Sequence, residues 1–251
     1  MTGVAWCTGA GKGIGRATAL LLAARGWTVA ASARTEADLL TLCEAAAMQN
    51  GAVHAYPLDV TDGDATERCV AAIEADLGPV SLAVLNAGTH APSPAAAFDS
   101  AIFRNLMQTN YFGVINGLSA LLSRFLQRRS GQVAVVASVA GYRGLPSAAA
   151  YGASKAALIN MCEALKPELD RAGVKLSLIN PGFVRTPLTD RNDFAMPFLI
   201  EADVAARRLL DGIDSGRFET TFPRRFTWML KLMRCLPYAL YFPLTRRLVR
   251  G

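Results

Sequence analysis

The sequence predicts an α/β fold in which a doubly wound parallel sheet of about seven strands is covered by helices on both faces. Three observations predict it. Short apolar, β-prone runs recur along the chain and alternate with segments of helical periodicity. Apolar residues make up 52% of the 251 residues, which is ample for a sheet buried on both faces. Glycine-containing or polar motifs follow several of these runs, where such sheets bind ligands.

The expected elements form one continuous strand-helix series. Strands are expected at Gly3–Cys7, Thr28–Ala33, Val53–Leu58, Ser81–Leu85, Val133–Ser138, Lys175–Asn180 and Phe218–Phe222. Helices are expected, for example, over Ala17–Arg25, Ile102–Leu126 and Ser147–Leu165. Because strands separated by helices pair in parallel through right-handed crossovers, we expect a single domain. It spans residues 1–222 and includes a substrate loop at 183–200, and residues 223–251 form a basic and hydrophobic extension of it.

A glycine-rich turn follows the first expected strand and opens the first expected helix. It reads Thr8-Gly9-Ala10-Gly11-Lys12-Gly13-Ile14-Gly15. This order brings backbone N–H groups and a helix N-terminus up to a phosphate, and glycines allow the close approach. The glycine spacing differs from the usual dinucleotide fingerprint and from a P-loop. The turn alone therefore predicts a phosphate-binding loop, with a flexible turn as the alternative.

Tyr151 and Lys155 lie one helical turn apart on the same face of the helix expected over Ser147–Leu165. An ammonium beside a phenol favours the phenolate, so we expect the pKa of Tyr151 to lie below its usual value of about 10. Ser138 ends the preceding strand and can supply a hydroxyl to the same reacting oxygen. The three residues predict a proton donor and acceptor that works near neutral pH.

Together these motifs resemble those of the short-chain dehydrogenase/reductase family, and the resemblance covers nearly the whole chain. Leu85 stands where many members have a second Asn before the Asn-Ala-Gly motif. The resemblance implies a Rossmann-like NAD(P)-binding domain and an oxidoreductase activity on a CH–OH or C=O group. Further matching motifs are Asp59-Val60, Asn86-Ala87-Gly88, Asn110 in Asn-Tyr-Phe-Gly, and Pro181-Gly182 followed by Val184 and Thr186.

The resemblance also implies a role for each matching residue. Tyr151 would protonate the developing alkoxide while Ser138 orients it. Lys155 would lower the pKa of Tyr151 and bind the nicotinamide ribose, and Asn110 would hold a water that links Lys155 to solvent. The catalytic set is therefore Asn110, Ser138, Tyr151 and Lys155. The implied cofactor-binding residues are Thr8, Gly9, Gly11, Lys12, Gly13, Ile14, Gly15, Arg34, Asp59, Val60, Asn86, Ala87, Gly88, Tyr151, Lys155, Pro181, Gly182, Val184 and Thr186.

The end of the second expected strand favours NADP(H) as the cofactor. A carboxylate at this place binds the ribose 2′-hydroxyl of NAD, whereas a basic residue accepts the 2′-phosphate of NADP. The strand ends in Arg34, and the nearest acid, Glu36, follows in the next helix. Lys12 can reach the same region, so two cations would meet the phosphate. The alternative is that Arg34 stacks on adenine or faces solvent.

The substrate pocket is expected around Ser138 and Tyr151, with Tyr142, Leu145 and Leu188 completing it. The segment Phe183 to Ile200, which includes Phe194 and Met196, is long, loop-like and apolar, so we expect it to close over the ligand as a lid. Its composition favours a hydrophobic substrate carrying a carbonyl or alcohol group. Packing of the lid alone would give the same composition.

The C-terminal segment from Phe222 to Gly251 is both basic and apolar. It carries seven basic residues and no acid, so its formal charge is +7 where the whole chain has +6. Such a mixture is typical of an amphipathic helix on a membrane surface. Lys231, Arg234 and Pro237 interrupt it, so we do not expect a membrane-spanning helix. The alternative is a helix that covers the pocket or a subunit interface. Because the rest of the chain is not basic, nucleic acid is not an expected partner.

The sequence also bears on metal sites, disulfides, cellular location and subunit assembly. The five cysteines and two histidines form no metal-ligand or disulfide pattern. The N-terminus has no secretory signal, so we expect a cytoplasmic protein, peripheral at the inner membrane face if the tail binds lipid. The resemblance implies a homodimer or homotetramer paired through Ile102–Leu126 and Tyr151–Leu165. The expected function is that of an NADP(H)-dependent oxidoreductase. One alternative is a non-catalytic NADP(H) sensor, although a sensor would not need the intact proton relay. The other is a membrane-associated scaffold.

Overall fold

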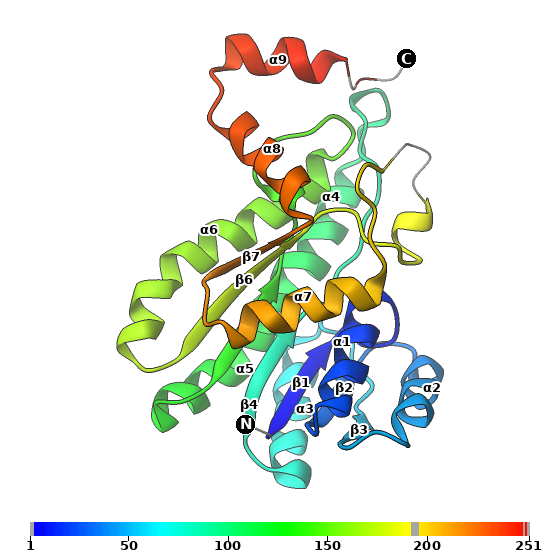
Figure 1. Cartoon of the computed structure of the whole chain (residues 1–251), viewed down its shortest axis with the longest axis vertical. Coiled ribbons are helices and arrows are strands. Elements are labelled where there is room, and N and C mark those ends of the chain that lie inside the picture. Colours follow the sequence, from blue (N-terminus) through cyan, green and yellow to red (C-terminus); the bar gives the residue numbers. More distant parts are fainter. Residues whose placement is uncertain (1–2, 192–195, 248, 250–251) are drawn as a thin grey trace.

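Seven parallel strands form one sheet in the part of the chain that the structure describes, a computed structural model of residues 3–191, 196–247 and 249. The strand order β3-β2-β1-β4-β5-β6-β7 and the helices on both faces confirm the predicted fold class (Figure 1). Since the order reverses between β1 and β4, ligands are expected beyond the carboxyl ends of these strands. The strands are β1 (Val4–Thr8), β2 (Thr28–Ser32), β3 (Ala52–Ala55), β4 (Val80–Leu85), β5 (Gln132–Val136), β6 (Lys175–Pro181) and β7 (Glu219–Phe222).

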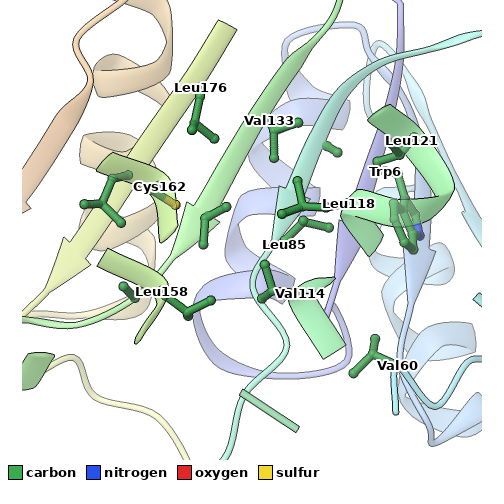
Figure 2. Close-up of a cluster of buried hydrophobic side chains, with 14 of the residues drawn as sticks. Trp6, Val60, Leu85, Val114, Leu118, Leu121, Val133, Leu158, Cys162 and Leu176 are labelled. Atoms are coloured by element: carbon green, nitrogen blue, oxygen red, sulfur yellow. The ribbon is translucent and has the colours of Figure 1, made fainter. Parts of the chain in front are cut away.

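Two apolar clusters, one on each face, hold the sheet between its helices. α1 (Gly13–Ala24), α2 (Glu36–Ala46) and α7 (Ala202–Asp214) contribute to one of them. α3 (Gly63–Leu77), α5 (Gly113–Arg128) and α6 (Ala149–Arg171) contribute to the other. Figure 2 shows this second cluster, with strand residues such as Trp6, Leu85 and Val133 facing helix residues such as Leu118 and Leu158. Burial on both faces makes the strands a rigid support for the loops at their carboxyl ends.

The helix predicted over Ile102–Leu126 is not continuous. It is divided into α4 (Ser100–Met107) and α5 by a π-helical turn at Gln108–Phe112, with Asn110 at its centre. Such a turn inserts one residue without disturbing the apolar face on either side, so periodicity does not reveal it. The helix expected to end at Leu165 also differs, because α6 continues through Pro167 to Arg171. A proline removes one backbone hydrogen bond, and here the packing of α6 against the sheet keeps the helix intact.

The C-terminal segment forms two helices where one was expected. α8 (Arg224–Arg234) follows β7, and α9 (Tyr238–Arg246) begins directly after Pro237. Both helices stand beyond the end of β7, with α9 farthest from the sheet, at the top of Figure 1. No helix in the described ranges is long and apolar enough to cross a membrane. All five cysteines have free thiols.

Candidate active site

The turn after β1 is fixed to the turn after β4 by hydrogen bonds. Thr8 is buried, and its Oγ1 accepts hydrogen bonds from the backbone N of Asn86 (3.0 Å) and of Ala87 (3.1 Å). The Asn86 amide donates back to the carbonyl oxygens of Thr8 (3.1 Å) and Gly9 (3.3 Å). The glycine-rich turn and the Asn-Ala-Gly motif, which lie far apart in sequence, therefore form one rigid unit at the switch point of the sheet.

Two glycines of this turn cannot be replaced without a clash. Gly9 has a φ of +65°, and a Cβ placed on it would lie 2.8 Å from Ala87 Cα. A Cβ on Gly15 would lie 2.3 Å from the carbonyl oxygen of Gly9. At the start of α1, Lys12 makes no capping hydrogen bond with its side chain, so the first N–H groups of the helix have no side-chain acceptor from it. N–H groups without a side-chain cap at the start of a helix fit a phosphate-containing cofactor.

The segment after β6 lies against the same glycine turn. A Cβ placed on Gly13 would lie 2.9 Å from Thr186 Cγ2, so only a glycine allows this approach. Gly88 similarly approaches Asn110 and Lys155, since a Cβ on it would lie 3.3 Å from Asn110 Oδ1 and 3.4 Å from Lys155 Nζ. These near-contacts bring the turns after β1, β4 and β6 together around one site.

Ser138 and Tyr151 meet at this site. Ser138 follows β5, and its Oγ accepts from the backbone N of Ala140 (3.1 Å) and donates to the carbonyl oxygen of Pro181 (3.4 Å). Ser138 lies close enough to Tyr151, in the first turn of α6, to lower the pKa of the phenol. The strand end fixes the serine and the helix fixes the tyrosine, so the two hydroxyls can share one substrate oxygen.

The Lys155 ammonium is buried one turn further along α6, with 3% of the residue exposed. Its Nζ donates to the carbonyl oxygen of Val136 (3.0 Å) and lies 5.8 Å from the centroid of the Tyr151 ring. Burial in these apolar surroundings lowers the pKa of Lys155 to about 8. The Lys155 ammonium can therefore release its proton only slightly above neutral pH.

The prediction of a lowered Tyr151 pKa is wrong for this structure. Burial raises the pKa of Tyr151 above its usual value, and the nearby Ser138 hydroxyl lowers it only in part. The physical reason is that the Lys155 ammonium is bonded to the Val136 carbonyl rather than to the phenolic oxygen. In this arrangement the phenol is protonated at neutral pH, which suits it to donate a proton.

Asn110 is fully buried at the centre of the π-helical turn. Its Oδ1 accepts from the backbone N of Thr89 (2.7 Å), and its amide donates to the carbonyl oxygen of Thr89 (3.0 Å) and to Ser154 Oγ (3.0 Å). Asn110 therefore joins the turn after β4 to α6. Both amide protons of Asn110 are used in these hydrogen bonds. A water bound by Asn110 would therefore have to donate a hydrogen bond to its Oδ1.

His90 lies against Tyr151. The two ring centroids are 4.9 Å apart and the rings meet edge to face at 78°. Half-burial lowers the pKa of His90, so a neutral imidazole faces the phenol. Its place directly after the Asn-Ala-Gly motif, at the carboxyl end of β4, was the signal in the sequence.

The adenosine end of the site holds an acid that sequence reasoning missed. Arg34 is exposed, whereas Lys12 forms an ion pair with Asp38 at 3.2 Å. A Cβ on Gly11 would lie 3.0 Å from Asp38 Cβ, so this carboxylate borders the glycine turn. Asp38 lies in the first turn of α2, one turn after Arg34, and that spacing could have indicated it.

Asp59 and Val60 lie after β3, which ends at Ala55 rather than at the expected Leu58, and the Asp59 carboxylate is already engaged. Its Oδ1 accepts from the backbone N (3.0 Å) and the hydroxyl (2.8 Å) of Thr61. Val60 is buried, and a Cβ on Gly113 would lie 2.7 Å from its Cγ2. An open cavity of about 420 Å³ lies beside Asp59 and is lined also by Tyr56, Leu58 and Arg68.

Two expected substrate residues lie beneath the C-terminal helices. The buried Tyr142 donates its hydroxyl hydrogen bond to Glu219 on β7, and the carboxylate also accepts from Asn180. Tyr142 and Leu145 line a very small cavity of about 10 Å³ together with Arg143, Leu230 and Tyr241. The structure thus brings these two residues against α8 and α9.

The loop that starts at Phe183 is closed at its base. The backbone N of Arg185 donates to the carbonyl oxygen of Ile200 (2.8 Å), and that of Ile200 donates to Phe183 (3.2 Å). Phe183 and Phe198 lie near Phe226 of α8, with ring centroids 5.4 and 6.2 Å apart. Leu188 is half-buried in this loop. Phe194, together with the rest of residues 192–195, lies outside the described residues.

Comparison with known proteins gives the same picture over most of the chain. The family model described as short chain dehydrogenase matches residues 3–195. An uncharacterized oxidoreductase of Myxococcus xanthus is 38% identical over 241 residues, which are 96% of this chain and 95% of that protein.

Solved structures of similar proteins contain both nicotinamide cofactors. A short-chain dehydrogenase/reductase from Burkholderia phymatum in complex with NAD superimposes with a TM-score of 0.84 at 25% identity, over 92% of each chain. A variant of actinorhodin polyketide ketoreductase with NADPH gives a TM-score of 0.80 at 26% identity, over 88% of this chain and 95% of that one. No group of residues suited to holding a metal ion is found in the described ranges.

Proposed function

The chain belongs to the short-chain dehydrogenase family, and from this premise we propose an NADP(H)-dependent oxidoreductase that acts on the carbonyl or alcohol carbon of a hydrophobic substrate. One observation carries the proposal: Ser138, Tyr151 and Lys155 lie together beside a glycine turn that admits no side chain. A bound nicotinamide would supply or take up the hydride. The protein then has to position the substrate oxygen and manage one proton.

The residues divide that task between them. In the reducing direction Tyr151 donates its proton to the substrate oxygen as charge develops there. Ser138, held by the backbone of Ala140 and Pro181, hydrogen-bonds the same oxygen and fixes its orientation. The buried Lys155 ammonium favours the phenolate that results. Asn110 keeps the turn after β4 and α6 in register, so the three groups stay aligned.

The preference for NADP(H) rests on the charge at the end of β2. Arg34 is exposed there, and within the described ranges it has no hydrogen bond or ion pair that would compete with a 2′-phosphate. Lys12 adds a second cation, but Asp38 neutralises it and could itself accept a hydrogen bond from a ribose hydroxyl. The two cations and the single acid favour the phosphate. The NADPH-bound actinorhodin ketoreductase and the NAD-bound Burkholderia protein show that similar folds take either cofactor.

Exchanging Arg34 for Ser should lower kcat/KM for NADPH by about 10- to 100-fold, because one charge-assisted hydrogen bond to the phosphate is lost. The value for NADH should hardly change. Asp38→Asn should shift the preference further toward NADPH, since it frees Lys12. Steady-state kinetics with both cofactors measure these ratios, and Arg171→Ser at the far end of α6 is the matched control. A wild-type enzyme that prefers NADH would rule out the proposed cofactor.

A graded panel of ketones and aldehydes, from short and polar to long-chain, tests the substrate class. With NADPH in excess, kcat/KM should rise by up to about fourfold for each methylene that the pocket buries. Activity on small polar carbonyls alone would contradict a hydrophobic substrate. If no compound of the panel is turned over although NADPH binding is measured, the result would favour the non-catalytic sensor.

As part of this function we infer a homodimer or homotetramer in the cytoplasm, with residues 223–251 in contact with the inner membrane face. Phe112, directly before α5, and Leu126, on α5, are exposed apolar residues. Their exposure supports subunit pairing through this region. The loop that starts at Phe183 would close over bound substrate, because its base is pinned and its aromatic residues face α8. Sedimentation velocity of the purified protein measures the assembly directly.

A further inference from the structure

α8 is apolar on both of its faces. Phe226, Thr227 and Leu230 are buried against the domain. The opposite face exposes Trp228, Met229 and Leu232, and both Trp228 (71%) and Leu232 (70%) keep most of their surface. A helix that serves only as a cover would place polar residues on its outer face. The outer face of α8 therefore lacks a partner within the described chain.

α9 also exposes large apolar side chains. Tyr241 and Thr245 face inward, whereas Tyr238 (69%), Leu240, Phe242 and Leu244 are exposed. The rings of Tyr238 and Phe242 stack with centroids 5.3 Å apart, which makes a flat aromatic area. We call the residues of α8 and α9, 224–246, the C-terminal hairpin. The large apolar side chains that this hairpin exposes are Trp228, Met229, Leu232, Tyr238, Leu240, Phe242 and Leu244. Exposed apolar side chains in such number mark an interaction site.

Exposed cations accompany these apolar side chains along the hairpin, and no acid lies within residues 223–251. Arg224 and Arg225 are exposed in the first turn of α8, where the helix dipole disfavours positive charge. They do not stabilise the helix, so their charge is available to an external anion. Arg234, Arg246 and Arg247 are also exposed, while Lys231 is paired with Glu219.

We propose that the C-terminal hairpin docks on an anionic lipid surface, with its exposed apolar side chains at the headgroup boundary and its arginines on lipid phosphates. Trp228 and Tyr238 are the residue types that favour this boundary. A second copy of the chain fits less well, because a two-fold contact would place this cationic surface against itself. Docking does not depend on the reaction proposed above.

The hairpin is joined firmly to the catalytic domain, so docking orients the whole molecule. Arg143, close after Ser138 in sequence, donates to the carbonyl oxygens of Met233 (2.7 Å) and Leu236 (2.6 Å). Its guanidinium lies 3.9 Å from the centroid of the Tyr241 ring. The inner face of α8 meets the loop at 183–200 through Phe226. A membrane at the outer face would thus lie close to the segment expected to admit substrate.

Intrinsic fluorescence reports docking directly, because Trp228 is the exposed tryptophan, whereas Trp6 is fully buried and Trp27 half-buried. We expect a blue shift of the emission when full-length protein meets vesicles of about three parts phosphatidylcholine to one part phosphatidylserine. Pure phosphatidylcholine vesicles should give little shift. Trp228→Phe should still sediment with the anionic vesicles and lose the emission change.

The charge requirement is tested by removing two arginines. Arg224→Gln with Arg225→Gln should weaken sedimentation with anionic vesicles by about fivefold per arginine. The fold should not suffer, since the two cations are unfavourable at that helix end. The matched control, Arg208→Gln with Arg217→Gln, removes the same charge from exposed positions on and after α7. It should leave binding unchanged.

The apolar requirement has its own pair of variants. Leu232→Ser should weaken binding by about tenfold or more, whereas Met48→Ser, at a fully solvated site after α2, should not. Equal loss in the control variants, or no preference for anionic vesicles, would overturn the proposal. So would self-association that depends on Arg224 and Arg225 in the absence of vesicle binding, since a second copy would then cover the surface.

Discussion

Replacing Tyr151 with Phe should lower the turnover rate by about 10²- to 10⁴-fold or more, while the cofactor affinity should remain nearly unchanged. The substitution removes one hydroxyl from a ring whose position is set by α6 and by the edge of His90. Ser138 keeps its bonds to Ala140 and Pro181, so the geometry of the site survives without its proton donor. The loss therefore reports chemistry rather than folding.

Stopped-flow or steady-state oxidation of NADPH measures the rate, and fluorescence titration measures the cofactor affinity. Tyr238→Phe is the matched control, since it removes a hydroxyl from an exposed ring of the C-terminal hairpin. Its rate should equal that of the wild type. Turnover retained in Tyr151→Phe would mean that another group, such as Ser138, supplies the proton.

Lys155→Met should abolish turnover as well, yet give a more stable protein. The ammonium is buried and its pKa is lowered from 10.5 to about 8, so at pH 7 the folded chain holds a charge that burial disfavours. Removing it relieves up to about 3 kcal/mol. The lost hydrogen bond to the Val136 carbonyl costs about 1 kcal/mol, which is smaller. We expect a net gain in the free energy of unfolding.

The pH dependence has a definite sign. Below pH of about 8, lysine is protonated in both states and the full penalty applies. Between about 8 and 10.5 the folded chain releases the proton that the unfolded chain still holds, so the stability of the wild type rises with pH. The advantage of Lys155→Met should therefore be largest at pH 7 and vanish near pH 10.5.

Urea unfolding at several pH values measures this difference, with Lys175→Met, at an exposed site on β6, as the control. Destabilisation of Lys155→Met at pH 7 would show that the ammonium is better solvated in the folded protein than its burial indicates. A site that keeps a destabilising charge is one in which function, rather than stability, selects the residue.

The central strands could be predicted closely from the sequence because they are buried on both faces, whereas the edge strand β3 is half exposed and ends at Ala55 rather than at the expected Leu58. A run such as Val133–Ser138 has to be apolar when helices cover both sides of β5. The motifs at the strand ends were equally accessible, since a glycine is required where a Cβ would meet backbone, as at Gly9 and Gly15. The sequence therefore predicts well which positions have to be buried and which have no room for a side chain.

The sequence predicts poorly which partner each polar side chain will bind. The link of Lys12 to Asp38, the bonds of Arg143 to the end of α8, and the preference of the Lys155 ammonium for a backbone carbonyl all depend on where loops come to rest. The lowered pKa expected for Tyr151 failed for the same reason. The π-helical turn around Asn110 was missed because it leaves the apolar pattern on both sides intact.

The strand order also bears on how the chain is made. After β4 pairs with β1, each later strand pairs with the strand synthesised just before it, from β4 to β5, β6 and finally β7. A nascent chain leaving the ribosome can therefore extend the sheet by one strand at a time, without waiting for a distant segment. Ser138 and Tyr151 emerge before β6 and β7, and α8 and α9 come last. The exposed apolar side chains of α8 and α9 are thus synthesised only after the strands and the Arg143 side chain that support them.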